Sequence, residues 1–150
     1  MFVDRVVINA YGAPGGAGSE AYRREKGVPR GGPAGGNGGR GGSVVMVADS
    51  QLTTLLDLRY RQHHRAERGS HGSGNNRTGK SGEDLLVQVP PGSVIKDADT
   101  QELLGELLES GDYLIVARGG RGGRGNANFT TATHQMPSRW EPGQPGEERR

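Results

Sequence analysis

Short runs of β-branched and aliphatic residues alternate along this chain with long stretches that contain few apolar side chains. Four of the runs are bounded by glycine, proline, asparagine or serine, a composition typical of strands that end in turns. They cover residues 2–9, 43–49, 84–90 and 111–117. Several short strands joined by tight turns predict a mainly β fold, in the form of an antiparallel sandwich or a barrel.

Helical signals are weaker than strand signals. LTTLLDLRY at 52–60 predicts one short helix, because its leucines share a helical face and Ser50 precedes them as a possible N-cap. The case for a helix in ELLGELLE at 102–109 is reduced by Gly105 in its middle. The chain after Phe129 is poor in aliphatic residues and contains several prolines and glycines, which indicates a surface segment or linker.

Glycine sets this chain apart from an ordinary globular domain. It occupies 28 of 150 positions, and 23 of these lie in residues 12–42, 69–82 and 119–125. Glycine recurs there at every third position, at Gly32, Gly35, Gly38 and Gly41 and again at Gly119, Gly122 and Gly125. A polyproline II helix turns every three residues, so this period leaves whole edges of such a helix without side chains. The pattern predicts extended backbones that lie directly against one another.

The same composition is also typical of flexible linkers and of disordered, arginine- and glycine-rich RNA-binding tracts. Ordering a backbone costs about 1–2 kcal/mol per residue, whereas each hydrogen bond returns roughly 0.5–1.5 kcal/mol. An ordered bundle therefore requires nearly every glycine-rich backbone to find a partner. Two tracts are continuous with predicted strands, at 41–47 and 112–120, and this continuity favours the ordered bundle.

Charge is distributed unevenly, although the net charge is only +2. Residues 1–82 carry 12 basic against 6 acidic side chains and residues 118–150 carry 6 against 3, whereas residues 83–117 carry 1 against 8. Two basic ends around an acidic middle are expected of a protein that presents one face to a polyanion. Arginines scattered over a solvated surface would give the same counts, so both interpretations stay open here.

Cysteine content and hydropathy narrow the possible locations. The chain has no cysteine, which excludes disulfides and thiolate metal sites and suits a reducing compartment, with the cytoplasm as the default expectation. Its longest apolar run, Leu114–Ala117, is too short to span a bilayer, and no signal peptide is visible.

Two motifs suggest ligand sites that their context argues against. GNNRTGKS at 74–81 matches the phosphate-binding pattern G-x-x-x-x-G-K-[ST], but a P-loop needs a strand before it and a helix after it. Here polar residues precede the motif and a predicted strand follows, so we interpret Arg77 and Lys80 as cations on a glycine-rich loop. His63 and His64 are adjacent and would lie on opposite faces of an extended chain, so we predict no metal site there. No paired nucleophile and base emerges, so we predict no catalytic residues.

Four glycine- and arginine-rich motifs occur in a fixed order along the chain. They are AYRREKGVPRGGPAGGNGGRGG at 21–42, LRYRQHHRAERGSHG at 58–72, VPPGSVIKD at 89–97 and ARGGRGGRGNANF at 117–129. In this order and spacing they resemble the N-terminal Obg domain of the Obg family of ribosome-associated GTPases. The resemblance extends from MFVDRV at the start to EPGQPGEER at the end, which is nearly the whole chain.

The resemblance implies one Obg domain over residues 1–150. Its expected fold is an eight-stranded β-barrel from which a glycine-rich bundle of left-handed polyproline II helices projects, with arms at about 11–43, 66–82 and 118–128. The segment YGAPGGAG at 11–18 departs from the paired glycines usual in the family, which leaves the packing of the first arm open. A GTPase domain should follow the Obg domain and would bind GTP and Mg²⁺, so we expect no cofactor and no enzymatic activity in this chain alone.

The function implied by the resemblance lies in assembly of the large ribosomal subunit, in anti-association and in the stress response. Such domains dock on rRNA near the peptidyl-transferase centre. Carried over by position, the expected rRNA-binding residues are Arg23, Arg24, Lys26, Arg30, Arg77, Lys80, Arg121 and Arg124. Arginine suits this task because its planar guanidinium grips phosphates and stacks on bases.

The alternative is a protein-interaction scaffold, in which the barrel docks against its own GTPase domain or a stress-signalling partner. Under either hypothesis we expect a monomer in the cytoplasm, or in an organelle for an organellar homologue, with no membrane partner.

Overall fold

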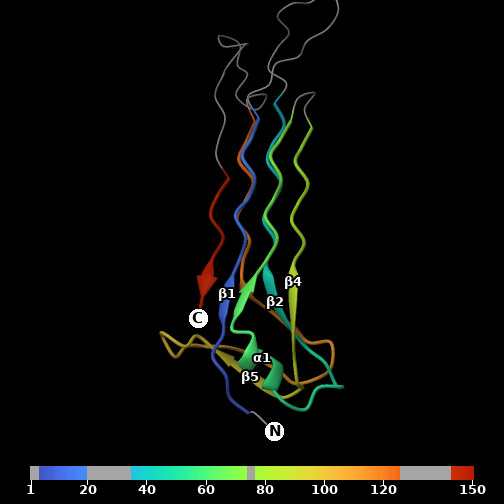
Figure 1. Cartoon of the computed structure of the whole chain (residues 1–150), viewed down its shortest axis with the longest axis vertical. Coiled ribbons are helices and arrows are strands. Elements are labelled where there is room, and N and C mark those ends of the chain that lie inside the picture. Colours follow the sequence, from blue (N-terminus) through green and yellow to red (C-terminus); the bar gives the residue numbers. More distant parts are fainter. Residues whose placement is uncertain (1–3, 20–34, 74–76, 126–142) are drawn as a thin grey trace, which may run out of the picture.

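A computed structural model describes residues 4–19, 35–73, 77–125 and 143–150. It consists of a base of short strands and a long stalk that projects from one side of the base (Figure 1). The described elements are β1 (Asn9–Tyr11), β2 (Val44–Ala48), α1 (Leu56–Tyr60), β3 (His63–Arg65), β4 (Leu85–Val89), β5 (Ser93–Lys96), β6 (Leu103–Leu107), β7 (Tyr113–Ala117) and β8 (Glu148–Arg149). The expectation of a mainly β protein is confirmed.

The strands of the base form three small sheets. Their strand orders are β3-β1-β8, β4-β2-β7 and β5-β6. β1 pairs in parallel with β3, and β2 pairs in parallel with β4 and antiparallel with β7. A purely antiparallel arrangement was therefore the wrong expectation for two strand pairs, because parallel strands need long crossover connections and the stalk provides them.

The core of the base is small. Its buried side chains are mostly valine, isoleucine, leucine and alanine. On β2 and β4 they are alternate residues, which lie on one face of each strand, and Leu58 of α1 joins them. Val44 on β2 and Ala117 on β7 have no exposed surface. A core of this size agrees with a composition in which only 31% of residues are hydrophobic, and much of the chain must be held by other contacts.

Strand and helix limits differ from the sequence expectations at the N-terminal end and at α1. Residues 4–8 of the predicted first strand do not pair with another strand. Val7 is exposed and Ile8 is buried, so the alternation in the sequence reflects an extended chain that has no partner strand. Helix α1 begins at Leu56, later than the predicted residue 52, and Ser50 does not cap it. Asp49 instead closes a turn there, because its carboxylate accepts the N–H of Gln51 at 2.9 Å.

The stalk consists of six extended segments, which we number in chain order. They are residues 12–19 (first), 35–42 (second), 66–73 (third), 77–84 (fourth), 118–125 (fifth) and 143–147 (sixth). Odd-numbered segments lead away from the base and even-numbered segments return to it (Figure 1). Because β1 and β3 both enter outgoing segments, and β2 and β4 both follow returning ones, each of these strand pairs is parallel.

Backbone hydrogen bonds join the segments with a period of three residues. In the first segment, Gly12 and Gly15 donate to the sixth, while Ala13, Gly16 and Ser19 donate to the second. In the second segment, Gly36, Gly39 and Gly42 donate to the third, while Gly38 and Gly41 donate to the fifth. Two of every three N–H groups in each of these central segments therefore bond to a neighbouring backbone, and the third position faces outward.

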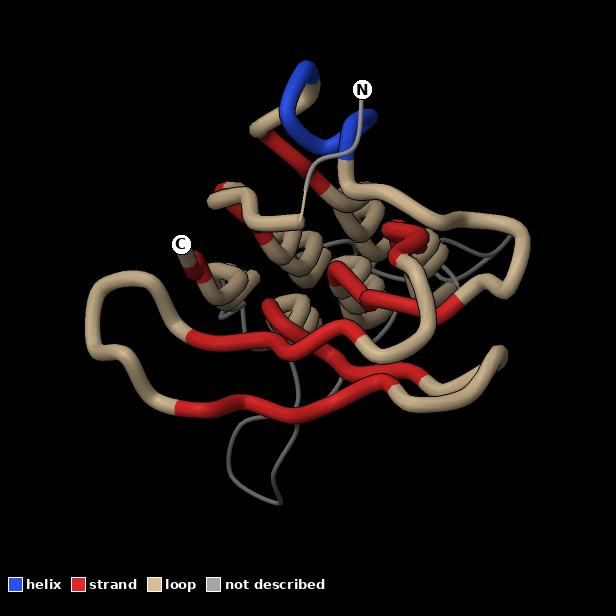
Figure 2. The backbone as a smooth tube through the Cα atoms, turned by 90° about the horizontal axis from the view of Figure 1, so that it is seen from below, coloured by secondary structure: helices blue, strands red, loops and turns tan. Residues whose placement is uncertain are grey.

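The links between segments define two layers of three. Bonds join the first segment to the second, third, fifth and sixth, and the second segment to the first, third, fourth and fifth. The third also bonds to the fourth, and the fifth to the sixth. The sixth, first and third segments thus form one layer, and the fifth, second and fourth form the other, an arrangement that Figure 2 shows end on.

Glycine is required inside the stalk because neighbouring backbones touch. A Cβ atom built at Gly38 would overlap the carbonyl group of Gly16, and one built at Gly41 would overlap that of Ala13. The same overlap with a backbone carbonyl occurs in the fifth segment, at Gly119, Gly122 and Gly125, the last of which faces Gly35. Gly32 lies outside the described residues.

Two expectations about the stalk change with the structure. The first arm, which departs from the family pattern, packs at the centre, since Ala13 and Gly16 are buried and bond to the second segment. The chain after Phe129 was expected to be a surface segment or a linker. Residues 143–149 are mostly exposed, but the linker alternative is wrong for them, because they form the sixth segment and β8. Gly143 and Gly146 there are three residues apart and face the carbonyls of Gly15 and Gly12.

We predict that Gly38→Val destabilises the chain by about 2 kcal/mol or more, because the new side chain forces the first and second segments apart. Ala17→Val is the matched control, since Ala17 is partly exposed on the outward edge of the first segment. Thermal unfolding measures both variants. Equal melting temperatures for the two would contradict the close packing described above.

Candidate nucleic-acid interface

Four of the eight sequence-predicted rRNA-binding residues lie in the described part of the chain. Arg77 and Lys80 belong to the fourth segment, and Arg121 and Arg124 to the fifth, and all four are exposed. Arg23, Arg24, Lys26 and Arg30 lie outside the described residues. The second segment lies between the fourth and the fifth in one layer, so the two described pairs flank it on opposite sides.

The threefold period of the stalk decides where these cations lie. In the fifth segment, Gly120 and Gly123 donate to the first segment, and the glycines that precede them face the second. The remaining edge carries Arg118, Arg121 and Arg124, and all three are exposed. The packing that buries the glycines therefore aligns the arginines in one outward row.

In the fourth segment, backbone hydrogen bonds fix the positions of Arg77 and Lys80. The carbonyl of Arg77 accepts the N–H of Ser73 at 3.0 Å, and that of Lys80 accepts the N–H of Ser70 at 2.9 Å. Gly79 and Gly82 donate in turn to the second segment. These bonds fix where each side chain leaves the stalk, and Lys80 is followed by strand β4 with no helix between them. The phosphate-binding geometry of a P-loop is absent from residues 77–89.

Sequence reasoning missed two further exposed cations on the stalk. Arg40 lies on the outward edge of the second segment and Arg68 on that of the third. The signal that identifies Arg40 is its place in the glycine period, since Gly38–Gly39 precede it and Gly41–Gly42 follow it. Arg68 has a weaker signal, a single glycine at its C-terminal side.

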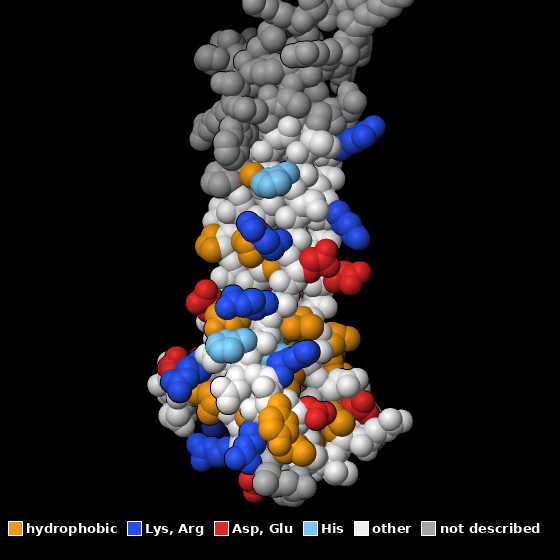
Figure 3. Space-filling view, in the orientation of Figure 1, with side chains coloured by type: hydrophobic (Ala, Val, Ile, Leu, Met, Phe, Trp, Pro, Cys, Tyr) orange, Lys and Arg blue, Asp and Glu red, His pale blue; other side chains and the backbone are white. Residues whose placement is uncertain are grey.

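Within the described part of the stalk, acidic side chains are confined to its junction with the base. The described residues farther out are 14–19, 35–41, 68–73, 77–82, 119–125 and 143–145, and none of them is Asp or Glu. Six of them are Arg or Lys, and Figure 3 shows cationic side chains spread along the stalk on the visible face. In the described part of the chain, the outer stalk thus carries positive charge alone.

The junction carboxylates replace carbonyl partners that the stalk no longer supplies. Asp84 accepts the N–H of Ser43 at 2.8 Å, and Glu147 accepts that of Arg118 at 2.9 Å. The Ser43 hydroxyl accepts the N–H of Gly119 at 2.9 Å. The threefold pattern ends here, and side-chain oxygens satisfy backbone donors that have no facing carbonyl.

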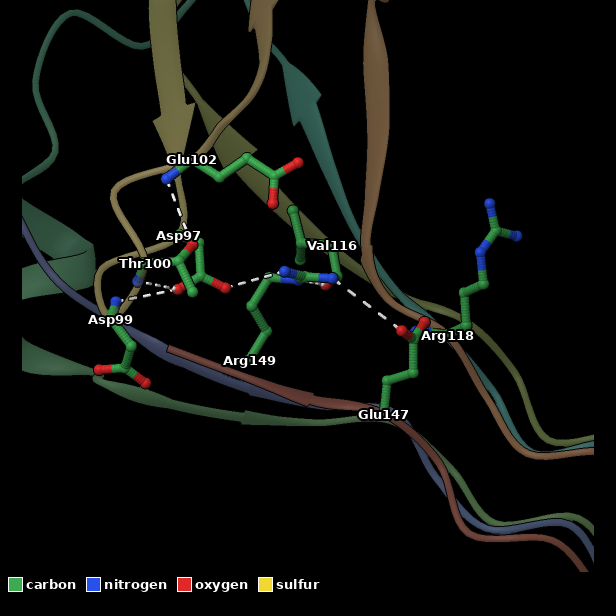
Figure 4. A network of polar contacts seen from close by, with 8 residues as sticks. All are labelled: Asp97, Asp99, Thr100, Glu102, Val116, Arg118, Glu147 and Arg149. Carbon is green, nitrogen blue, oxygen red and sulfur yellow. Dashed lines mark hydrogen bonds and ion pairs between the residues drawn. The ribbon is translucent and has the colours of Figure 1, made fainter.

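An ion pair fastens β8, which follows the sixth segment, to the turn after β5 (Figure 4). The Arg149 Nη1 donates to Asp97 at 2.8 Å, and its Nε donates to the carbonyl of Val116 at 2.7 Å. The other Asp97 oxygen accepts the N–H groups of Thr100 and Asp99, each at 2.9 Å. The Thr100 N–H first, then the Asp99 N–H and the Arg149 guanidinium, hold the pKa of Asp97 below its usual range against an opposing effect of burial.

The adjacent residues His63 and His64 point to opposite faces of their strand, as expected for an extended chain. His63 is exposed and His64 is buried, because both lie on the extended strand β3. Burial lowers the pKa of His64, whose neutral ring donates from Nε2 to the carbonyl of Arg61 at 2.9 Å. Among the described residues no three His, Asp or Glu side chains are grouped to hold a metal ion.

Comparison with known proteins relates this chain to one family. A family model described as GTP1/OBG matches residues 3–150. The chain is 56% identical to the GTPase Obg of Desulfitobacterium hafniense over 149 residues, and 55% identical to that of Persephonella marina over 148 residues. Each alignment covers 99% of this chain but only 35% and 44% of the relative. The chain therefore spans less than half the length of these relatives.

In the part of the chain that the structure describes, no helix is long and apolar enough to cross a membrane.

We predict that Asp97→Asn lowers stability at neutral pH and flattens its dependence on pH. The pKa of Asp97 is lower in the folded chain than in the unfolded chain, so the ionised carboxylate stabilises the fold. This contribution to the free energy of unfolding is fully present above the ordinary carboxyl pKa of about 3.9, and it is lost as pH falls through the lower pKa of the folded chain. Thermal unfolding between pH 2 and 7 measures this loss in the parent chain. Asp99→Asn is the control, because Asp99 and its partner Arg150 are both exposed. Parallel pH profiles for Asp97→Asn and the parent would contradict the assignment.

Proposed function

This chain belongs to the GTP1/OBG family, and we propose that it is the rRNA-docking domain of a ribosome-associated GTPase that acts on the large ribosomal subunit. The observation that carries the proposal is the outer stalk, a narrow rod whose described residues carry six exposed cations and no carboxylate. A polyanion with a deep pocket is the partner that such a rod fits best. We propose rRNA near the peptidyl-transferase centre as this partner.

We further propose that the six segments are left-handed polyproline II helices and that the base closes into a barrel. The three-residue period of the hydrogen bonds supports the first assignment, because polyproline II has three residues per turn and leaves every N–H available for a neighbour. The three sheets around one shared core support the second. Rigidity matters for this function, since a preformed rod loses little conformational entropy on entering a pocket.

GTP chemistry belongs to the rest of the protein in this proposal. The relatives that match are named GTPase Obg, and the aligned region is about a third of the first of them. A GTPase domain binding GTP and Mg²⁺ would lie outside the aligned region. Within this chain the residues proposed to contact rRNA are Arg77, Lys80, Arg121 and Arg124, together with Arg23, Arg24, Lys26 and Arg30.

We predict that replacing Arg77, Lys80, Arg121 and Arg124 with glutamine weakens binding to purified large ribosomal subunits and lowers the salt dependence of binding. Removing one phosphate-binding cation reduces the slope of log K against log salt by about 0.7–0.9, so removing four reduces it by roughly 3. Arg5→Gln with Lys96→Gln is the control, because both residues are exposed on the base. Sedimentation with subunits at several salt concentrations gives the slopes, and a slope unchanged from the parent would refute phosphate binding by the stalk.

A protein-binding role is the second candidate, and the outer face of sheet β4-β2-β7 favours it. Leu86 and Ile115 flank Val45 there, and Tyr113 lies opposite Val47. The exposed fractions are 62% for Leu86 and 68% for Tyr113. An exposed apolar sheet face, two of whose three strands lie in the acidic region 83–117, suits a protein partner better than RNA.

We predict that Leu86→Ser with Tyr113→Ser abolishes any association with a separately expressed GTPase domain of a GTPase Obg relative, while binding to large subunits is kept. Isothermal titration measures the first interaction and sedimentation the second. Should the double variant bind the GTPase domain as the parent does, this face is not the protein-binding surface.

A further inference from the structure

The third segment has an outward edge of its own, which lies in the opposite layer from Arg77, Lys80, Arg121 and Arg124. Its residue 66 donates to Tyr11 of β1, residues 69 and 72 donate to the first segment, and residues 70 and 73 donate to the fourth. The remaining edge carries Arg65, Arg68 and His71, and all three are exposed. At the proposed polyproline II rise of about 3.1 Å per residue, successive members are roughly 9 Å apart.

The same row continues onto the base as a stack of side chains. The Arg65 guanidinium lies 4.0 Å from the centre of the Tyr11 ring. The His63 ring stacks on Tyr11 with centroids 5.9 Å apart and planes at 16°, and the Tyr11 hydroxyl lies 3.0 Å from His63 Nδ1. These contacts hold an arginine plane and two rings in fixed positions on the paired strands β1 and β3.

The end of α1 is separated from β3 by two residues and adds two more exposed side chains. Tyr60 is 80% exposed, and Arg61, which follows it, is also exposed. We call Tyr60, Arg61, His63, Arg65, Arg68 and His71 the basic strip. Figure 3 shows a file of blue (arginine or lysine) and pale blue (histidine) side chains descending the stalk onto the base, with acidic side chains beside its lower part.

Acidic side chains border the base end of the basic strip, because Glu148 on β8 is paired with Tyr11 and Asp57 lies one helical turn before Tyr60 and Arg61. Between residues 59 and 73 the acidic side chain is Glu67, and its carboxylate accepts the N–H of Glu83 on the fourth segment at 3.2 Å. Glu67 thus lies on the edge that faces the fourth segment, away from the edge of Arg65 and Arg68. The strip therefore carries the positive charges of Arg61, Arg65 and Arg68, with aromatic rings at its base end.

We propose that the basic strip is a second RNA-binding surface, which binds a single-stranded segment running along the third segment onto the base. Arg65 and Arg68 bind successive phosphates, and Tyr60 stacks on an unpaired base. Rows of cations interrupted by exposed aromatic rings are the pattern by which proteins bind single strands, because the charges follow the backbone and every base has a face to stack on. The proposal rests on the proposed rRNA-docking function and adds a surface outside the residues assigned to it.

The test uses the whole chain and a fluorescein-labelled, mixed-sequence single-stranded RNA oligonucleotide, followed by fluorescence anisotropy. Arg65→Gln with Arg68→Gln should weaken binding about tenfold at physiological salt and reduce the salt slope by about 1.4, the value for removing two phosphate-binding cations from a single-strand complex. The control, Arg5→Gln with Lys96→Gln, removes the same charge outside the strip and should leave the slope unchanged. Equal slopes for the two double variants would overturn the proposal.

Tyr60 supplies a readout that net charge does not affect. Tyr60→Ala should weaken binding of the single strand by about fivefold or more, whereas Tyr60→Phe, which keeps the ring, should bind as the parent does. Neither substitution should change binding to a duplex RNA of the same length. Equally weakened binding for Tyr60→Ala and Tyr60→Phe, or an equal effect on duplex binding, would overturn the stacking role.

The failure of this proposal is distinguishable from failure of the rRNA-docking function. If the variant lacking Arg77, Lys80, Arg121 and Arg124 binds large subunits more weakly while the Arg65 and Arg68 variant binds them as the parent does, the strip does not bind RNA and the function stands. If neither variant is weakened toward subunits or the oligonucleotide, both proposals are wrong.

Discussion

The structure depends on contact between bare backbones. Inside the stalk the α-carbon of a glycine in one segment lies against the carbonyl group of another, as Gly38 does against Gly16, and no side chain fits between them. The N–H group of a glycine in such a contact can donate to a third segment, as Gly38 of the second segment donates to the carbonyl of Gly123 in the fifth at 2.8 Å. Packing and hydrogen bonding therefore require the same positions, and a period of three residues satisfies both.

This close contact between backbones also determines how the strands of the base pair and where the charged side chains of the stalk lie. The segments hold the ends of the strands in register, so β1 and β3 pair in parallel although more than fifty residues separate them in sequence. Since the interior of the stalk contains almost no side chains, nearly every side chain of the stalk points outward. Arginine at every third position therefore forms a straight row, as Arg118, Arg121 and Arg124 do, without any contact between the arginines themselves.

Sequence reasoning was most successful where one local signal decided the outcome. The glycine period predicted close-packed extended segments, and the aliphatic runs predicted β2, β4 and β7 within one or two residues. It failed where the outcome depended on distant partners. Only two glycines, Gly143 and Gly146, mark the sixth segment, and parallel pairing of β1 with β3 follows from the path of the stalk. Of the candidate interface, Arg121 and Arg124 were recognisable from their spacing, whereas the Tyr11 and Arg65 stack joins residues that only the fold brings together.

Amide hydrogen exchange on the intact chain, resolved residue by residue, tests the bare-backbone stalk most directly. The amides of Gly36, Gly39 and Gly41 donate to neighbouring segments and should exchange slowly. The amides of Arg40 and Arg121, on the outward edges, should exchange quickly, so that protection repeats every three residues along the second and fifth segments. Uniformly fast exchange throughout residues 35–42 and 118–125 would show that the segments do not pack, and the account of both fold and function would fail with them.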